Sequence, residues 1–233
     1  MKKILNLLLV SVLCLTLISC KNNSSSSTPQ ANDDTITKRV EEIATSYDIE
    51  KIGSIVVAMD KTNEKTEDLL ERNANSIIRD LGTSYESYMN NKDKITKFYE
   101  DSLLTTKALH SFYKKATKDS LLNVSKMDLN NKDLLKSVFL PFTDEYMEDM
   151  DDLLEEINDT YEDNYETSLR LINKQGDTNA LAAMQKEHTD ALKAIRDLHN
   201  NNYIELTNIH TDAYNTLFNG NTDISNILKK LDE

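Results

Sequence analysis

Apolar residues recur at intervals of three and four along most of this 233-residue chain, from Ile36 onward. This spacing is typical of amphipathic helices, because an α-helix turns once in 3.6 residues and gathers such positions on one face. The chain also has only four glycines, two prolines and no tryptophan, which disfavours a turn-rich sheet protein. The pattern predicts an all-α fold, an elongated antiparallel helical bundle with long amphipathic helices, over residues 35–233.

Interruptions in this pattern predict where one helix ends and the next begins. A helical stripe is interrupted wherever polar residues occupy the expected apolar positions. The interruptions fall at residues 60–63, 90–93 and 127–131, and they separate apolar stripes at residues 36–59, 70–88 and 95–116.

Proline and capping residues predict the helix ends in the second half of the chain. Pro141 lacks an amide donor and clashes with the preceding turn, so we expect it to end or kink a short helix that contains Leu134. Thr143 can cap the next helix at its start, and Gly176 suits the left-handed conformation that often follows a helix.

A last long helix is predicted between Asp177, which can cap its start, and Gly220, which can end it. An eleven-residue period runs through this helix: His-Thr-Asp-Ala at residues 188–191 returns twenty-two positions later at residues 210–213, and His199 lies midway between the two histidines. Eleven residues give 3.67 per turn, so the helix should run almost straight. A short closing helix is predicted from the spacing of Ile224, Ile227, Leu228 and Leu231.

The first twenty residues follow a different pattern. Lys2 and Lys3 precede an apolar run from Ile4 to Ile18, and polar residues follow Cys20 directly. This order is typical of a secretory signal. The run of about fifteen residues is short for a transmembrane helix, which needs about 20.

The tetrad Leu17-Ile18-Ser19-Cys20 resembles the lipobox of bacterial lipoproteins, in which signal peptidase II cuts before a cysteine that carries diacylglycerol. The resemblance implies a signal peptide at residues 1–19, lipidation of Cys20, and a lipidated cysteine and flexible tether at residues 20–34, whose polar composition cannot support a core. Ordinary secretory cleavage is the alternative, but it prefers a small residue where Leu17 stands. Two or three acyl chains would hold the protein on a membrane permanently.

The resemblance also implies that the protein is located in the cell envelope. Lys21 is not the aspartate that is associated with retention in the inner membrane, so in an organism with two membranes the outer membrane is favoured. Whether the protein faces the surface or the periplasm stays open. Helical surface lipoproteins of spirochaetes are similar in anchor, tether and composition.

The charge balance narrows the set of partners. The chain has 27 basic and 40 acidic residues, and removal of residues 1–19 would leave 25 against 40, a formal charge of −15. Such a body repels nucleic acid and anionic lipid headgroups, so no nucleic-acid binding is expected. Cys14 would leave with the signal and Cys20 would carry lipid, which leaves no cysteine for a disulfide.

The acidic residues are concentrated in one run. Residues 144–166 contain twelve acidic residues and no basic one, whereas residues 92–118 carry seven lysines against three acids. We expect the lysine-rich helix to lie beside the acidic one and complement its charge. The alternative is an exposed acidic surface for a basic partner. An EF-hand calcium loop is disfavoured, because its central glycine and alternating ligands are absent.

His188, His199 and His210 follow the eleven-residue period. They fall within about 40° of one another on the helix and point inward, but successive ones are about 16 Å apart, so they cannot bind one metal together. We expect interior histidines that are hydrogen-bonded to tyrosine, asparagine or threonine. They are weak candidates for a metal site completed by other helices, or for a pH-sensitive packing switch.

No catalytic motif is present, so the chain is not expected to be an enzyme or to need a cofactor. The sequence favours a membrane-anchored, non-catalytic binding module at the bacterial cell envelope or surface. Its partner could be a host protein, an envelope component or a second copy of the chain. The alternatives are a periplasmic metal- or small-ligand-binding lipoprotein that uses the histidines, and a structural envelope spacer.

Overall fold

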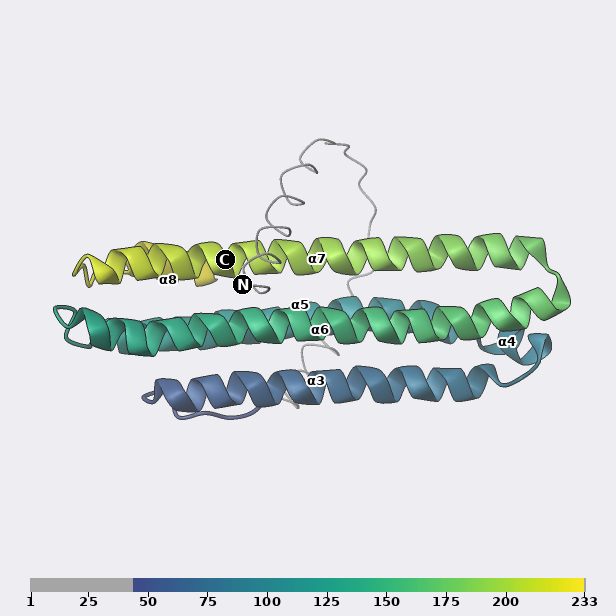
Figure 1. Cartoon of the computed structure of the whole chain (residues 1–233), viewed down its shortest axis with the longest axis horizontal. Coiled ribbons are helices and arrows are strands. Elements are labelled where there is room, and N and C mark those ends of the chain that lie inside the picture. The colour runs from purple at the N-terminus through teal and green to yellow at the C-terminus, as the bar shows by residue number, and fades with distance from the viewer. Residues whose placement is uncertain (1–43, 233) are drawn as a thin grey trace, which may run out of the picture. The chain divides into compact units, whose positions relative to one another are not determined.

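The structure is a computed structural model that describes residues 44–232, and every regular element in this part of the chain is a helix. The all-α prediction is confirmed. The proposed signal peptide, Cys20, the tether and the start of the first apolar stripe lie outside the described residues. Residues 44–232 form α3 (Ile52–Leu81), α4 (Tyr85–Asn91), α5 (Asp93–Val124), α6 (Lys132–Gln175), α7 (Thr178–Phe218) and α8 (Ser225–Asp232) (Figure 1).

The four long helices α3, α5, α6 and α7 run side by side, and each is antiparallel to the next along the chain (Figure 1). Their order around the bundle differs from their order in the sequence, because α3 packs on α5 and α6, while α7 packs on the same two helices. Two pairs of neighbours are therefore parallel, α3 with α6 and α5 with α7. The parallel register of α5 and α7 is visible in the contacts from Thr96 to Glu187 and from Thr117 to His210.

Aromatic residues occupy the centre of the bundle, where α5 and α6 meet. The rings of Tyr113 and Tyr146 lie 5.3 Å apart, and those of Tyr99 and Tyr161 lie 4.5 Å apart. Burying a tyrosine requires a partner for its hydroxyl. The Tyr146 hydroxyl donates to the Asn202 carbonyl at 3.2 Å, and the Tyr161 hydroxyl donates to the Tyr99 carbonyl at 3.3 Å.

The break predicted at residues 60–63 is wrong, because α3 continues through these polar residues. Two of the hydroxyl groups in this helix are satisfied inside it: Thr62 donates to the Ala58 carbonyl at 2.6 Å and Thr66 donates to the Thr62 carbonyl at 2.7 Å. The stripe also predicted helix at Tyr47, which instead lies in the non-helical residues 44–51 and packs its ring against Phe112.

The helix predicted over residues 70–88 is broken at Gly82, which has φ +66. A side chain there would be strained, and its Cβ would approach Ser87 Oγ to 2.8 Å. Ser84 then caps α4 by accepting from the Ser87 amide. At the predicted break of residues 90–93, the single residue Lys92 separates α4 from α5, and the predicted loop at 127–131 lies between α5 and α6.

Of the two outcomes expected at Pro141, an end or a kink, the helix end is wrong, because α6 continues through this residue. Pro141 and Ser137 are both exposed, so water can satisfy the Ser137 carbonyl that the proline leaves without a partner. Thr143 is consequently an interior residue and not a cap, and its hydroxyl donates to the Phe139 carbonyl at 3.2 Å. The cap of α6 is Asn131, which accepts from the Leu134 amide at 3.0 Å.

The predictions for the turn between α6 and α7 are confirmed. Gly176 adopts the left-handed conformation with φ +76, and Asp177 accepts from the amides of Asn179 and Ala180. The closing helix α8 is also confirmed, and it buries Ile227 and Leu231. One row of the eleven-residue period in α7 is buried throughout, namely Met184, Ile195, Leu206 and Leu217.

Candidate functional site

The parallel packing of α3 and α6 brings two acidic stretches side by side. Glu67 of α3 interacts with Asp152 and Glu156 of α6, and Glu71 interacts with the same Glu156. We call the whole set the acidic seam. It comprises Asp60, Glu64, Glu67, Asp68 and Glu71 of α3 with Glu145, Glu148, Asp149, Asp152, Glu156, Asp159 and Asp163 of α6.

The electrostatics of the acidic seam disfavour the charged form of four of its carboxyl groups. Burial, followed by repulsion from the facing carboxylates, raises the pKa of Glu67, Glu145 and Glu156 above the usual range. The strongest effect is on Asp149, where burial raises the pKa to about 7 although the Tyr113 hydroxyl donates to this carboxyl at 2.7 Å. The seam therefore holds like charges close together at a cost in free energy.

The expectation that the lysines of residues 92–118 neutralise the acidic run is wrong. Within residues 44–232, none of these lysines forms an ion pair with residues 144–166, because the acidic edge of α6 faces α3 while α5 meets α6 through the aromatic core. Six of the seven lysines pair with acids elsewhere. Lys94 binds Asp80 at 2.8 Å, and Lys114 binds Glu205 at 2.9 Å.

Asp60, Glu145 and Asp149 form the tightest cluster of the acidic seam. One carboxylate oxygen from each of the three lies within 4.8 Å of the other two. Asp149 is buried, and Asp60 and Glu145 are half-buried, so water reaches one side of the group. Oxygen-only ligand sets of this kind suit hard cations and not zinc.

The histidines of α7 point inward as predicted, and each is 7 % exposed or less. His188 stacks on Tyr165 with ring centroids 4.2 Å apart, its Nε2 lies 3.3 Å from Glu162, and its Nδ1 lies 3.4 Å from the Tyr99 hydroxyl. His199 lies 3.8 Å from Asp151. Burial lowers the pKa of both histidines, so they are neutral at pH 7.

His210 has the most enclosed ring of the three. Its Nε2 is 3.1 Å from the Thr117 hydroxyl, and the rings of Phe139, Phe142 and Tyr146 surround it at 5.2 to 6.1 Å. Burial lowers its pKa to about 4. The three histidines thus contact separate sets of partners, as their spacing along the helix predicted.

Sequence reasoning missed the carboxylates that face these histidines and one further histidine. Glu162 and Asp151 belong to α6, so no spacing within α7 could reveal them. His110 of α5 lies 3.0 Å from Glu205, which also binds Lys114. The lysine-rich composition of residues 92–118 signalled such pairs, but it did not identify α7 as the partner helix.

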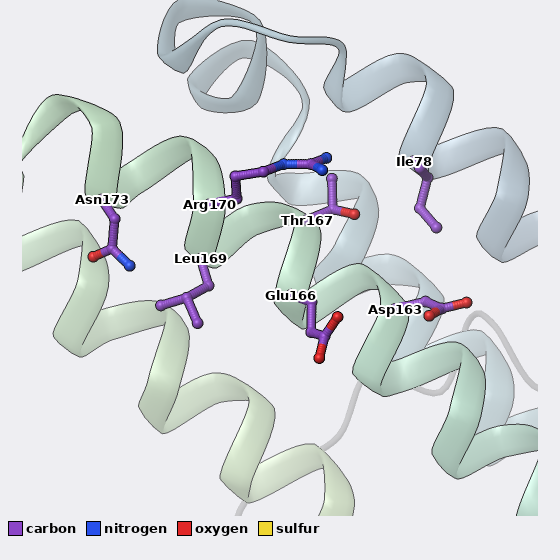
Figure 2. Close-up of a pocket in the computed structure, with 7 residues that line it drawn as sticks. All are labelled: Ile78, Asp163, Glu166, Thr167, Leu169, Arg170 and Asn173. Atoms are coloured by element: carbon purple, nitrogen blue, oxygen red, sulfur yellow. The ribbon is translucent and has the colours of Figure 1, made fainter.

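An open hollow of about 510 Å³ lies along the second half of α6. Ile78 of α3 lines one side of it, and the other lining residues shown are Asp163, Glu166, Thr167, Leu169, Arg170 and Asn173 of α6 (Figure 2). Their side chains spread away from one another and do not converge on a point (Figure 2). The hollow therefore lacks the convergent polar groups of a small-molecule site.

These features define an all-α bundle protein with an acidic seam between two parallel helices. Within residues 44–232, none of the helices combines the length and the apolar character that are needed to cross a membrane. No protein-family model, no curated protein and no solved structure matches the chain.

Proposed function

We propose that this protein is a lipid-anchored, non-catalytic binding module of the bacterial cell envelope, and that its acidic seam docks a Lys/Arg-rich segment of a partner protein. The observation that carries the proposal is the acidic seam itself. Burial, together with the facing carboxylates, raises the pKa of Glu67 and Glu156 there, and Lys94 and Lys114 of α5 pair with acids elsewhere. A basic partner would relieve this repulsion. The negative charge of the seam therefore favours association with a positively charged segment and disfavours a negatively charged one.

The anchor in this proposal is Cys20, through the likeness of residues 17–20 to a lipobox. Lipidation would hold the bundle at a membrane while the net charge of the chain keeps its body off anionic headgroups. A non-catalytic role agrees with the open hollow on α6, whose lining side chains diverge.

Metabolic labelling tests the anchor. We expect radioactive palmitate to label the protein in its native host and the labelled form to fractionate with membranes. Cys20→Ser should abolish both, whereas Cys14→Ser, which removes the other cysteine, should abolish neither. Unlabelled protein, or label that survives Cys20→Ser, would refute lipidation at this residue.

Protease treatment of intact cells then shows on which side of the membrane the bundle lies. Loss of the bundle from living cells would support a partner outside the cell. Survival until the outer barrier is broken would restrict the partner to the envelope.

Variants in which acidic residues are replaced by neutral amides test the acidic seam as a docking surface. The probe is a fluorescent lysine-rich peptide, and its affinity is measured at low and at high salt. We expect neutralisation of the seam to weaken binding at least tenfold, and removal of the same number of charges from α7 to weaken it less than threefold. Equal losses would show that net charge alone attracts the peptide. The seam variant is Glu67→Gln/Asp152→Asn/Glu156→Gln, and its control is Asp190→Asn/Asp197→Asn/Asp212→Asn.

The rival histidine-based ligand function has a direct test. Metal analysis of the purified chain would return stoichiometric zinc or iron, lost in His199→Ala, if that alternative holds. The stacked and hydrogen-bonded environments of His188 and His210 favour a packing role instead.

A further inference from the structure

Asn63 is a polar residue buried among the carboxylates of α3. Its side chain is 4 % exposed, and its Nδ2 donates to Glu67 Oε1 at 2.6 Å. Its Oδ1 is buried and has no hydrogen-bond partner among the described residues. A buried carbonyl oxygen without a donor is costly, so its position calls for an explanation.

The helical position of Asn63 places its side chain beside the cluster of Asp60, Glu145 and Asp149. Asp60 and Glu67 both act on Asp149, and they lie about one helical turn before and after Asn63 on the same side of α3. Asn63 therefore lies opposite Asp149. Because Nδ2 donates to Glu67, one turn further along α3, we expect the oxygen on the other side of the planar amide to be directed back toward Asp60.

From this arrangement we propose that Asp60, Asn63, Glu145 and Asp149 form a binding site for a Ca²⁺ ion between α3 and α6. The site supplies three carboxylates and one amide oxygen, which are groups that Ca²⁺ commonly takes as ligands. Water completes the coordination from the exposed side of Asp60 and Glu145. The proposal goes beyond the docking function, since it concerns an ion and not a protein partner.

The rigidity of two packed helices favours Ca²⁺ over Mg²⁺. The three carboxylate oxygens lie within 4.8 Å of one another, close enough to share one ion. Mg²⁺ demands a near-ideal octahedron with ligands at about 2.1 Å, whereas Ca²⁺ accepts irregular geometry with ligands at about 2.4 Å. Side chains held on two packed helices adapt poorly to the octahedral demand.

A bound Ca²⁺ ion would link the two helices at the place where their charges oppose each other most. It supplies positive charge to the buried Asp149 and a partner to the Asn63 oxygen. Because the ion binds the folded bundle and not the unfolded chain, binding should raise the melting temperature with ion concentration.

The test uses the full chain, treated with EDTA and then dialysed, with Ca²⁺ itself as the probe. Calorimetric titration should give one ion per chain, and thermal unfolding should show a saturable rise in melting temperature. Mg²⁺ at the same concentration should give a rise less than half as large. Absence of saturable Ca²⁺ binding to the wild-type chain overturns the proposal.

Matched variants separate a defined site from general screening of an acidic surface. Asp60→Asn and Glu145→Gln should each weaken Ca²⁺ binding at least tenfold. Asp68→Asn and Glu155→Gln remove the same charges from exposed positions of the same helices, and should change affinity less than twofold. Equal losses in both sets would show screening only and would overturn the site. Melting in EDTA verifies that each variant is folded.

Substitution of Asn63 tests the least expected ligand. Asn63→Ala should weaken Ca²⁺ binding about tenfold, and Asn63→Asp should restore or strengthen it, because a carboxylate can replace the amide oxygen. Unchanged Ca²⁺ affinity in Asn63→Ala contradicts the assignment of this residue. The outcome is independent of the peptide experiment, since the docking variants leave all four proposed ligands in place.

Discussion

The bundle contains two parallel helix pairs that differ in how their facing polar side chains are matched. Across α5 and α7, partners of opposite character meet: Glu205 accepts from Lys114 at 2.9 Å and lies 3.0 Å from His110, and the Thr117 hydroxyl lies 3.1 Å from His210. Across α3 and α6, carboxylates face carboxylates, and Asp149 interacts unfavourably with Asp60 and Glu67.

The difference shows that parallel packing does not impose a charge pattern on its own. In the α5–α7 pair the polar groups stabilise the bundle from within. In the α3–α6 pair the same geometry leaves negative charge that a group from outside, a cation or a basic segment, can neutralise. Matched and unmatched polar groups thus lie on opposite sides of one fold.

The largest effect is expected on the α5–α7 side, from the acid response of His210. Burial lowers the pKa of His210 to about 4, against about 6.5 in an unfolded chain. Between these two pH values the unfolded state binds a proton and the folded state does not. This contribution to stability is complete above pH 6.5 and is lost as the pH falls toward 4, by up to about 3 kcal/mol. His210→Gln, which keeps an acceptor for Thr117, should flatten that loss in urea unfolding measured from pH 7 to 4.5. A wild-type pH dependence in the variant would contradict this account.

A smaller effect is expected when the charge of Glu205 is reversed. Burial alone would raise the pKa of Glu205, but Lys114 and His110 together lower it, so the carboxylate is stabilised in the charged state. Glu205→Lys would set three potential cations together and should lower the free energy of unfolding by about 2 kcal/mol. Chemical denaturation at pH 7 and low salt measures it. A neutral effect would mean that these pairs are too solvated to matter.

The same substitution on the other side should have the opposite sign. Glu67→Lys places a cation between Asp152 and Glu156, so we expect the free energy of unfolding to rise by about 1 kcal/mol in EDTA. The gain should shrink in 1 M NaCl, because salt screens partly exposed charges. Destabilisation by Glu67→Lys would remove the contrast between the two helix pairs.

The smallest effect provides the baseline for both sides. Lys186 and Asp190 form an exposed ion pair one turn apart on α7, at 2.5 Å. Such pairs contribute little, so Lys186→Ala should leave the denaturation midpoint unchanged within error. A shift as large as that of Glu67→Lys would show that single surface charges, and not the acidic seam, dominate these measurements.

The sequence predicted features that are encoded locally and missed those that depend on which helices become neighbours. Gly176 and Asp177 predicted a helix end and a helix cap. Both predictions are confirmed, because these features depend only on residues next to them in the sequence. The helix end predicted at Pro141 is wrong for a different reason. The free-energy cost of a proline inside a helix depends on whether water reaches the carbonyl that it leaves unpaired, here that of Ser137, and this exposure is a property of the assembled bundle. The approach of Asp60 to Glu145 follows from the order of helices around the core, and no spacing within one helix contains that information.

The helix order of this bundle also has a consequence for how the chain folds. Contacts between α5 and α7 join residues 91 to 95 positions apart, and α3 likewise finds α6 only after α5 has intervened. Such long-range contacts slow the search for the native state relative to a bundle whose adjacent helices are consecutive. During synthesis the face of α3 that packs on α6 must remain uncovered until α6 has been made, so the unfinished chain exposes apolar surface.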